Sequence, residues 1–231
     1  MTGTLNRPTD AARVDERLNA QAREFLASPH RLLIDGQWVD AEDGRTFGTY
    51  DPATGAEITR VAHGAAADVD KAVAAARRAF DDGAWVNMKP SDREQILWRI
   101  GDLLEEKGEL FGQIEALDNG KAATIAQAVD VKFAADVFRY YAGWVTKLEG
   151  TTVPVSMPFA GDTQFHAYTQ RVPVGVCGQI IPWNFPLLMA AWKLGPALAT
   201  ANTLVLKPAE QTPLTALLLG EICAEAGVPD G

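Results

Sequence analysis

The stretch Val174-Gly-Val-Cys-Gly-Gln-Ile-Ile181 decides the fold, together with Thr203-Leu-Val-Leu206 further along the chain. Both are nearly continuous apolar runs, which is typical of strands buried in a parallel sheet. A helical pattern over Leu187–Thr200 separates them, and a second one over Thr212–Gly227 follows. The order strand, helix, strand, helix predicts an α/β fold. In it, residues 174–231 form the first half of a doubly wound, Rossmann-like parallel sheet.

An antiparallel ribbon is predicted upstream. Asp35-Gly36 stands between two short apolar runs, and this dipeptide is a strong signal for a two-residue hairpin turn. Strands are expected at Arg31–Ile34, Gln37–Val39, Thr46–Asp51 and Glu57–Ala62.

Helical patterns occupy the region between the ribbon and residue 149. Asp68 is expected to cap a helix that runs to Phe80, and Ser91-Asp92-Arg93-Glu94 reads as a capping box for the next one. A third helix over Glu109–Leu117 stops at Asn119-Gly120. The last runs from about Ala122 to Leu148, with an apolar face that we assign to the core, although such a face can also meet a partner. Its members are Ile125, Val129, Phe133, Val137, Tyr140, Tyr141 and Trp144.

Two segments lie outside these blocks. Residues 1–30 read as a polar lead-in, and the pattern predicts one weak amphipathic helix there, with Val14, Leu18, Ala22 and Leu26 on its apolar face. Residues 150–173 read as two strands, Thr151–Val155 and Phe165–Val172, around a loop rich in Pro, Gly and Asp. An extended pair of this kind can lie on the domain surface or be lent to a neighbouring subunit.

Composition excludes several classes of protein. The 231 residues hold 21 Lys and Arg against 30 Asp and Glu, and this acidity argues against a nucleic-acid partner. Two cysteines exclude a disulfide scaffold, and the spacing of the three histidines predicts no metal site. The most apolar window, Leu187–Leu206, contains Lys193, Pro196 and Asn202, so no membrane span is expected. We therefore expect a cytoplasmic protein.

The predicted sheet singles out two loops, because ligands of such sheets bind beyond the carboxyl ends of the strands. The first loop is Pro182-Trp-Asn-Phe-Pro186 and the second is Lys207-Pro-Ala-Glu210. Asn184 offers an amide donor, Lys207 a cation and Glu210 a carboxylate. No GxGxxG fingerprint accompanies them, so the βαβ unit alone indicates no particular function.

Several motifs carry a resemblance to one family. Ile180–Pro186, Trp192–Ala199 and Lys207–Pro213 closely resemble the aldehyde dehydrogenase superfamily, as do Asp118–Lys121 and Phe138–Trp144 upstream. The resemblance covers about residues 31–231. It implies NAD(P)-dependent oxidation of an aldehyde through a thioester. It also implies that residues 31–149 belong to the cofactor-binding domain and that 150–173 is an oligomerisation-type strand pair. A homo-oligomer is therefore expected.

The resemblance also implies residue roles. Asn184 matches the side-chain donor of the oxyanion hole. Lys207 and Glu210 match the positions that hold the adenosine ribose, and a carboxylate at 210 favours NAD over NADP, because it repels a 2′-phosphate. Ile180, Ile181, Pro182 and Trp183 match backbone and wall contacts to the cofactor. Phe185, Met189 and Trp192 match the substrate channel, whose large apolar residues suit an aldehyde with a hydrophobic body.

The resemblance further implies that the nucleophilic Cys and the general-base Glu lie downstream of Gly231. Cys177 and Cys223 are expected to be buried and unable to replace that nucleophile. We thus expect an N-terminal portion that is inactive as an isolated chain, from a truncated or split gene or an expressed piece. It would associate with a C-terminal half. The alternative is a non-catalytic partner or regulatory module that docks on a full-length paralogue; a nucleotide-binding fold with unrelated chemistry is a third reading.

Overall fold

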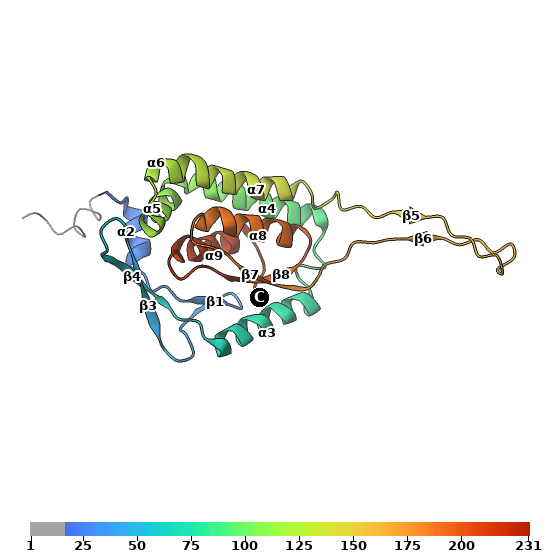
Figure 1. Ribbon diagram of the computed structural model, residues 1–231, viewed down its shortest axis with the longest axis horizontal. Helices are drawn as coiled ribbons and strands as arrows, with labels where there is room; N and C mark the ends of the chain where they lie inside the picture. Colours follow the sequence, from blue (N-terminus) through green and yellow to red (C-terminus); the bar gives the residue numbers. More distant parts are fainter. Residues whose placement is uncertain (1–16) are drawn as a thin grey trace, which may run out of the picture.

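The computed structural model describes residues 17–231, and a parallel strand pair lies at its centre (Figure 1). Strands β7 (Val176–Ile180) and β8 (Thr203–Lys207) pair in register from Val176↔Thr203 to Ile180↔Lys207. Helix α8 (Pro186–Ala199) connects them, and α9 (Leu214–Ala226) follows β8. Both helices lie on one side of the pair, and α3 (Ala66–Asp82) lies on the other. The predicted α/β fold is confirmed.

One buried asparagine joins the starts of both strands. The Asn202 Oδ1 accepts hydrogen bonds from the backbone N–H groups of Val174 and Gly175, at 2.7 and 3.0 Å, while its Nδ2 donates to the Ala197 carbonyl at the end of α8. The next residue, Thr203, donates to the Ala76 carbonyl of α3 at 2.8 Å. The turn between α8 and β8 therefore helps to set the register of the two strands and also anchors α3 to the start of β8.

The prediction that Val174–Ile181 is fully buried was wrong. Val174 is 87% exposed and Ile180 is 75% exposed. The reason is that β7 and β8 form a two-stranded sheet; within residues 17–231 no further strand pairs with either. Side chains at the outer edges of the pair therefore meet solvent, although their sequence has the apolar character of a central strand.

The predicted ribbon is present as two separate antiparallel pairs. Strands β1 (Leu32–Ile34) and β2 (Gln37–Val39) form the expected hairpin, and β3 (Thr46–Tyr50) pairs with β4 (Glu57–Ala62). Asp35 and Gly36 both have positive φ, 54° and 70°, as a two-residue hairpin turn requires. Helix α2 (Ala20–Ala27) precedes them. It confirms part of the amphipathic helix predicted in residues 1–30, while Val14 lies outside the described residues.

Two predicted helix starts were shifted by a few residues. Helix α3 begins at Ala66, so Asp68 lies inside its first turn, where its carboxylate accepts from the N–H groups of Ala65 and Glu42. Helix α4 (Pro90–Glu106) begins at Pro90 and not at Ser91. Proline suits the first helical position, because it has no N–H to leave unpaired there. Helix α5 (Gly108–Asn119) ends as predicted, with Gly120 at a φ of 86°.

The long helix predicted over 122–148 is composite. It comprises α6 (Ala123–Ile125), a π-helical turn η1 (Ala126–Val131) and α7 (Lys132–Ala142). Most of its large apolar residues face outward, so their assignment to the core was wrong. Ile125, Val129, Phe133, Tyr140 and Trp144 are 42–60% exposed. Helix α7 packs on α4 and α8. Its buried residues are mainly small ones around one aromatic ring, namely Ala134, Ala135, Val137, Phe138 and Ala142, so among the predicted core residues Val137 is confirmed.

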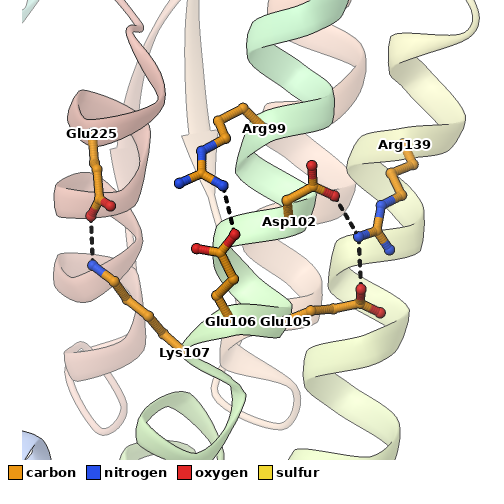
Figure 2. A network of polar contacts seen from close by, with 7 residues as sticks. All are labelled: Arg99, Asp102, Glu105, Glu106, Lys107, Arg139 and Glu225. Carbon is orange, nitrogen blue, oxygen red and sulfur yellow. Dashed lines mark hydrogen bonds and ion pairs between the residues drawn. The ribbon is translucent and has the colours of Figure 1, made fainter.

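Ion pairs reinforce the packing of α7 on α4 (Figure 2). The Arg139 guanidinium of α7 contacts Asp102 at 2.8 Å and Glu105 at 2.7 Å, both on α4. Lys107, at the end of α4, pairs with Glu225 of α9. The helices that support the strand pair are thereby linked to one another at their polar surface as well as through the core.

Residues 150–173 form an arm that projects from the body (Figure 1). Its strands β5 (Thr152–Val153) and β6 (Ala167–Tyr168) are antiparallel, and they are shorter than predicted. None of the helices in residues 17–231 combines the length and the apolar character that a bilayer crossing requires.

Candidate functional site

The two loops singled out by the sequence leave the same edge of the strand pair. Ile180 lies opposite Lys207 in the parallel register, and the Ile181 N–H donates to the Lys207 carbonyl at 3.2 Å. The loop Pro182–Pro186 follows the end of β7, and the loop Lys207–Glu210 follows the end of β8. This edge is the candidate functional site.

Asn184 lies at the centre of the first loop, and its side chain is exposed. It forms no hydrogen bond with any other residue of the described part of the chain. An amide without an internal partner keeps its N–H donors free for a ligand oxygen. No hydrogen bond or ion pair within residues 17–231 joins Asn184 to Lys207 or Glu210, so the structure brings together the loops but not these side chains.

Lys207 and Glu210 form an ion pair across the second loop. Both side chains are more than half exposed, at 52% and 62%. The hydrogen bond from Lys207 lowers the pKa of the Glu210 carboxyl, which is therefore ionised at neutral pH. A carboxylate with solvent-facing oxygens can accept from two neighbouring hydroxyl groups, as a ribose presents.

The residues predicted to form cofactor walls differ in exposure. Ile181 is 3% exposed and belongs to the core, whereas Ile180 is 75% and Trp183 is 59% exposed. Pro182 is exposed as well. Three of the four therefore present apolar surface beside the strand ends.

Phe185, Met189 and Trp192 share one face at the start of α8, because they are spaced four and three residues apart. The Phe133 ring of α7 packs edge-to-face on Trp192, with ring centroids 6.4 Å apart. Sequence reasoning placed Phe133 in the core and so missed it as a neighbour of this face. The only feature of the sequence that could have indicated an exposed Phe133 is its position four residues after Val129, on the same stripe of the helix.

Residues in and just after α5, which are distant in the sequence, contact the segment around Asn184. The Asn119 Nδ2 donates to the Trp183 carbonyl at 2.8 Å, and the Lys121 Nζ lies 4.4 Å from the centroid of the Phe185 ring. The Glu115 carboxylate accepts from the Leu187 N–H at 3.3 Å. The sequence marked residues 118–121 only as a family motif, and it gave no signal for Glu115.

Buried charges accompany these contacts. Glu115 is fully buried, and burial raises the pKa of its carboxyl; Lys121 pairs with it at 3.5 Å and also with the buried Asp130 of η1. Asp118 accepts from the Leu214 N–H at the start of α9, and burial raises the pKa of its carboxyl to about 8. Helix α5 therefore supplies carboxyl oxygens to the N-terminal ends of both α8 and α9, where free N–H groups need acceptors.

Both cysteines were predicted to be buried, but in the structure each is only partly buried. Cys177 lies within β7. Cys223 lies within α9, where its apolar surroundings raise the pKa of the thiol to about 12. A thiol of this pKa is almost entirely protonated at neutral pH and is a poor nucleophile. In residues 17–231, no group of three or more His, Cys, Asp or Glu side chains is arranged to hold a metal ion.

Comparison with known proteins places this geometry in context. The sequence profile of the aldehyde dehydrogenase family matches residues 38–231. The chain is 52% identical over 210 residues to phenylacetaldehyde dehydrogenase of Pseudomonas fluorescens, and 47% identical over 228 residues to the mitochondrial aldehyde dehydrogenase of Rattus norvegicus. These alignments cover 91% and 95% of the chain, but 42% and 43% of the relatives.

Solved structures of aldehyde dehydrogenases have the same fold over this part of their chains. The structure of the NAD+ complex of aldehyde dehydrogenase from Bacillus cereus is 45% identical, with a TM-score of 0.88, over 93% of this chain and 42% of that one. The chain thus spans about two fifths of the length of the proteins that it matches.

Proposed function

Since the chain belongs to the aldehyde dehydrogenase family, we propose that its strand-end site supplies the oxyanion donor, the ribose contacts and one apolar wall for NAD-dependent aldehyde oxidation. The observation that carries this proposal is the parallel pairing of Ile180 with Lys207, because it directs the Asn184 loop and the Lys207–Glu210 loop to one edge.

Asn184 is the proposed catalytic residue of this portion. An attacking thiolate drives negative charge onto the aldehyde oxygen, and an amide N–H aimed at that oxygen stabilises the charge as it develops. The exposed side chain, which has no internal partner in the described residues, is consistent with this role. Removal of one such donor typically costs about 10²–10³ in kcat.

NAD is the proposed cofactor, and when bound it supplies the hydride acceptor. Glu210 would accept from the ribose hydroxyl groups, with Lys207 beside it, and Ile180, Ile181, Pro182 and Trp183 would form the adjoining wall. The ionised Glu210 would repel the 2′-phosphate of NADP. We therefore expect Glu210→Gln to raise the use of NADP relative to NAD.

Phe185, Met189 and Trp192 are the proposed substrate-channel wall, and Phe133 joins them through its contact with Trp192. Three aromatic rings and a thioether favour an aldehyde with an apolar body over a small or charged one.

We expect the 231-residue chain to be inactive alone, because neither of its cysteines has the features of a nucleophile. Cys177 is part of a strand, and the Cys223 thiol stays protonated. The test compares the chain with a chimera in which residues 1–231 precede the remaining part of the Pseudomonas fluorescens relative. NADH formation is measured with aliphatic and aromatic aldehydes.

The chimera should oxidise aldehydes and the chain alone should not. In the chimera, Asn184→Ala should lower kcat by about 10²–10³. Asn87→Ala, at an exposed asparagine between α3 and α4, is the matched control and should leave kcat unchanged. Turnover by the isolated chain would contradict the proposed inactivity, and a chimera indifferent to Asn184→Ala would contradict the role of Asn184.

A second candidate function is association. The arm of residues 150–173 and the exposed aromatic stripe of α7 offer apolar surface at Phe159, Tyr168 and Tyr140, which are 60–87% exposed. We propose that these surfaces join copies of the chain, a C-terminal half or a full-length paralogue. Size-exclusion chromatography of the chain, alone and with a full-length relative, tests this: a lone monomeric peak in both runs would contradict it. The cytoplasmic location stays a prediction from the sequence.

A further inference from the structure

The N-terminal end of α8 has no cap of its own. Its N-cap residue is Phe185, whose side chain cannot accept a hydrogen bond, and Pro186 follows at the first helical position. The Leu187 N–H instead finds the Glu115 carboxylate of α5, 72 residues earlier in the chain. The start of α8, and with it the loop that holds Asn184, is therefore anchored by another helix.

Two further contacts from the same helix end reach the loop on either side of Asn184. Asn119, the last residue of α5, holds the Trp183 carbonyl at 2.8 Å. Lys121, just beyond, places its ammonium 4.4 Å from the centroid of the Phe185 ring, a distance suited to a cation–π interaction. Residues 183, 185 and 187 are thus each held, while the Asn184 side chain between them stays exposed.

The positions of Asn119 and Lys121 are themselves restrained. Gly120 between them adopts a φ of 86°, and a Cβ there would lie 2.6 Å from the Pro52 ring, so glycine allows a close approach to that segment. Lys121 is 16% exposed and is held by Glu115 and by Asp130. Asp130 belongs to the π-helical turn η1 and is 1% exposed. The buried carboxyl groups of Glu115 and Asp130 therefore hold the ammonium that faces Phe185.

We propose that Glu115, Asn119 and Lys121 are positioning residues, which hold the backbone around Asn184 so that its amide has one orientation. The proposal rests on the proposed function for its meaning, because Asn184 matters only as an oxyanion donor. These three residues do not touch the reacting atoms; they act through residues 183, 185 and 187. A preformed donor needs no reorganisation when charge develops, which is the physical advantage of such an arrangement.

The test measures the order of Asn184 in the 231-residue chain. Selective [15N]asparagine labelling leaves six asparagines visible by NMR, and the loss of one signal in Asn184→Ala identifies residue 184. The 15N T1 and T2 and the {1H}–15N NOE then give the order parameter of its backbone amide, which reports motion on the picosecond-to-nanosecond scale. The wild-type chain should give a rigid Asn184, with an order parameter of about 0.85.

Asn119→Ala should lower the Asn184 order parameter below about 0.6, while Asn87 and Asn202 keep their wild-type values. Gln113→Ala is the matched control: it removes an amide from the same helix, where Gln113 contacts Asn19 and Glu109 and not the loop. A merely structural loss would affect all asparagine signals together. Should Asn119→Ala fail to fold, Asn119→Asp, which replaces the donor with an acceptor of the same size, gives the same test.

Lys121→Met should mobilise Asn184 in the same way, and Lys121→Arg, which keeps a cation over the Phe185 ring, should restore the rigid value. The proposal is overturned if Asn184 is as rigid in Asn119→Ala and Lys121→Met as in the wild-type chain. The outcome is independent of the chimera assay: an inactive chimera with a rigid Asn184 would refute the proposed function alone, and an active chimera with an unaffected Asn184 would refute the positioning alone.

Discussion

Asp118 gives the chain a pH dependence of stability that one substitution should remove. Its carboxyl is 2% exposed; its Oδ2 accepts from the Leu214 N–H at 2.9 Å, and its Oδ1 has no partner. Burial raises the pKa of this carboxyl from 3.8 to about 8, and the nearby Glu115 carboxyl adds to the rise. The folded chain therefore holds a proton on Asp118 at neutral pH that the unfolded chain releases.

The sign follows from proton linkage. Stability falls as pH rises wherever the folded state binds more protons than the unfolded state. The pKa of Asp118 is about 8 in the folded chain and 3.8 in the unfolded one. Its stabilising contribution to the free energy of unfolding is therefore complete below pH 3.8 and is lost as pH rises through 8. Between pH 5 and pH 7 the loss is about 2.6 kcal/mol, close to the limit of 1.36 kcal/mol per pH unit.

Asp118→Asn should abolish this loss, because the amide keeps an acceptor for the Leu214 N–H and does not titrate. Urea unfolding at pH 5, 6 and 7, followed by circular dichroism, gives the free energy of unfolding at each pH. Wild type should lose about 2–3 kcal/mol relative to Asp118→Asn across this range. Asp70→Asn, at an exposed position of α3, is the matched control and should run parallel to wild type. Parallel curves for wild type and Asp118→Asn would refute the reasoning.

Three further predictions follow from burial and backbone geometry. Phe138→Ala should lower the free energy of unfolding by about 3–5 kcal/mol, because this ring of α7 is fully buried. Phe159→Ala, at an 87% exposed site, should change it by less than about 0.5 kcal/mol, and equal effects in urea unfolding would contradict the burial of Phe138. Gly36→Ala should destabilise by about 1–2 kcal/mol, since φ is 70° there, and Gly178→Ala in β7, which has open space for a methyl group, should be neutral or stabilising by thermal unfolding. In Cys177→Ser, the remaining Cys223 should react with a thiol reagent at pH 8 only when urea unfolds the chain; fast labelling of the folded chain would show that its pKa is not raised.

Local chemistry explains which elements the sequence could predict. The β1–β2 hairpin follows from Asp35-Gly36, because few other residue pairs adopt positive φ twice in succession. The end of α5 follows from Gly120 for the same reason. Both signals are confined to a few neighbouring residues, so no distant contact is needed to read them.

Tertiary contacts explain where prediction failed. The periodicity of residues 122–148 correctly shows an apolar stripe, but periodicity does not say which stripe is buried. The small side chains at 134, 135 and 142 are buried together with Phe138 on the inner side of α7, while Phe133 and Tyr140 are left outside. The π-helical turn η1 also changes the helical phase before α7, which a regular repeat cannot anticipate.

The candidate site also combines features that local sequence predicts with features that depend on tertiary contacts. The strand-end rule locates Asn184, Lys207 and Glu210, because it depends only on the order of strands and helices. The contacts that hold the Asn184 loop come from residues 64 and 72 positions earlier, and a glutamate within a helix has no local signature. The Pro182–Pro186 motif is therefore not sufficient to define the geometry of the proposed oxyanion donor. A chain that keeps this motif but lacks Glu115, Asn119 and Lys121 would preserve the sequence of the proposed donor without the contacts that hold its loop.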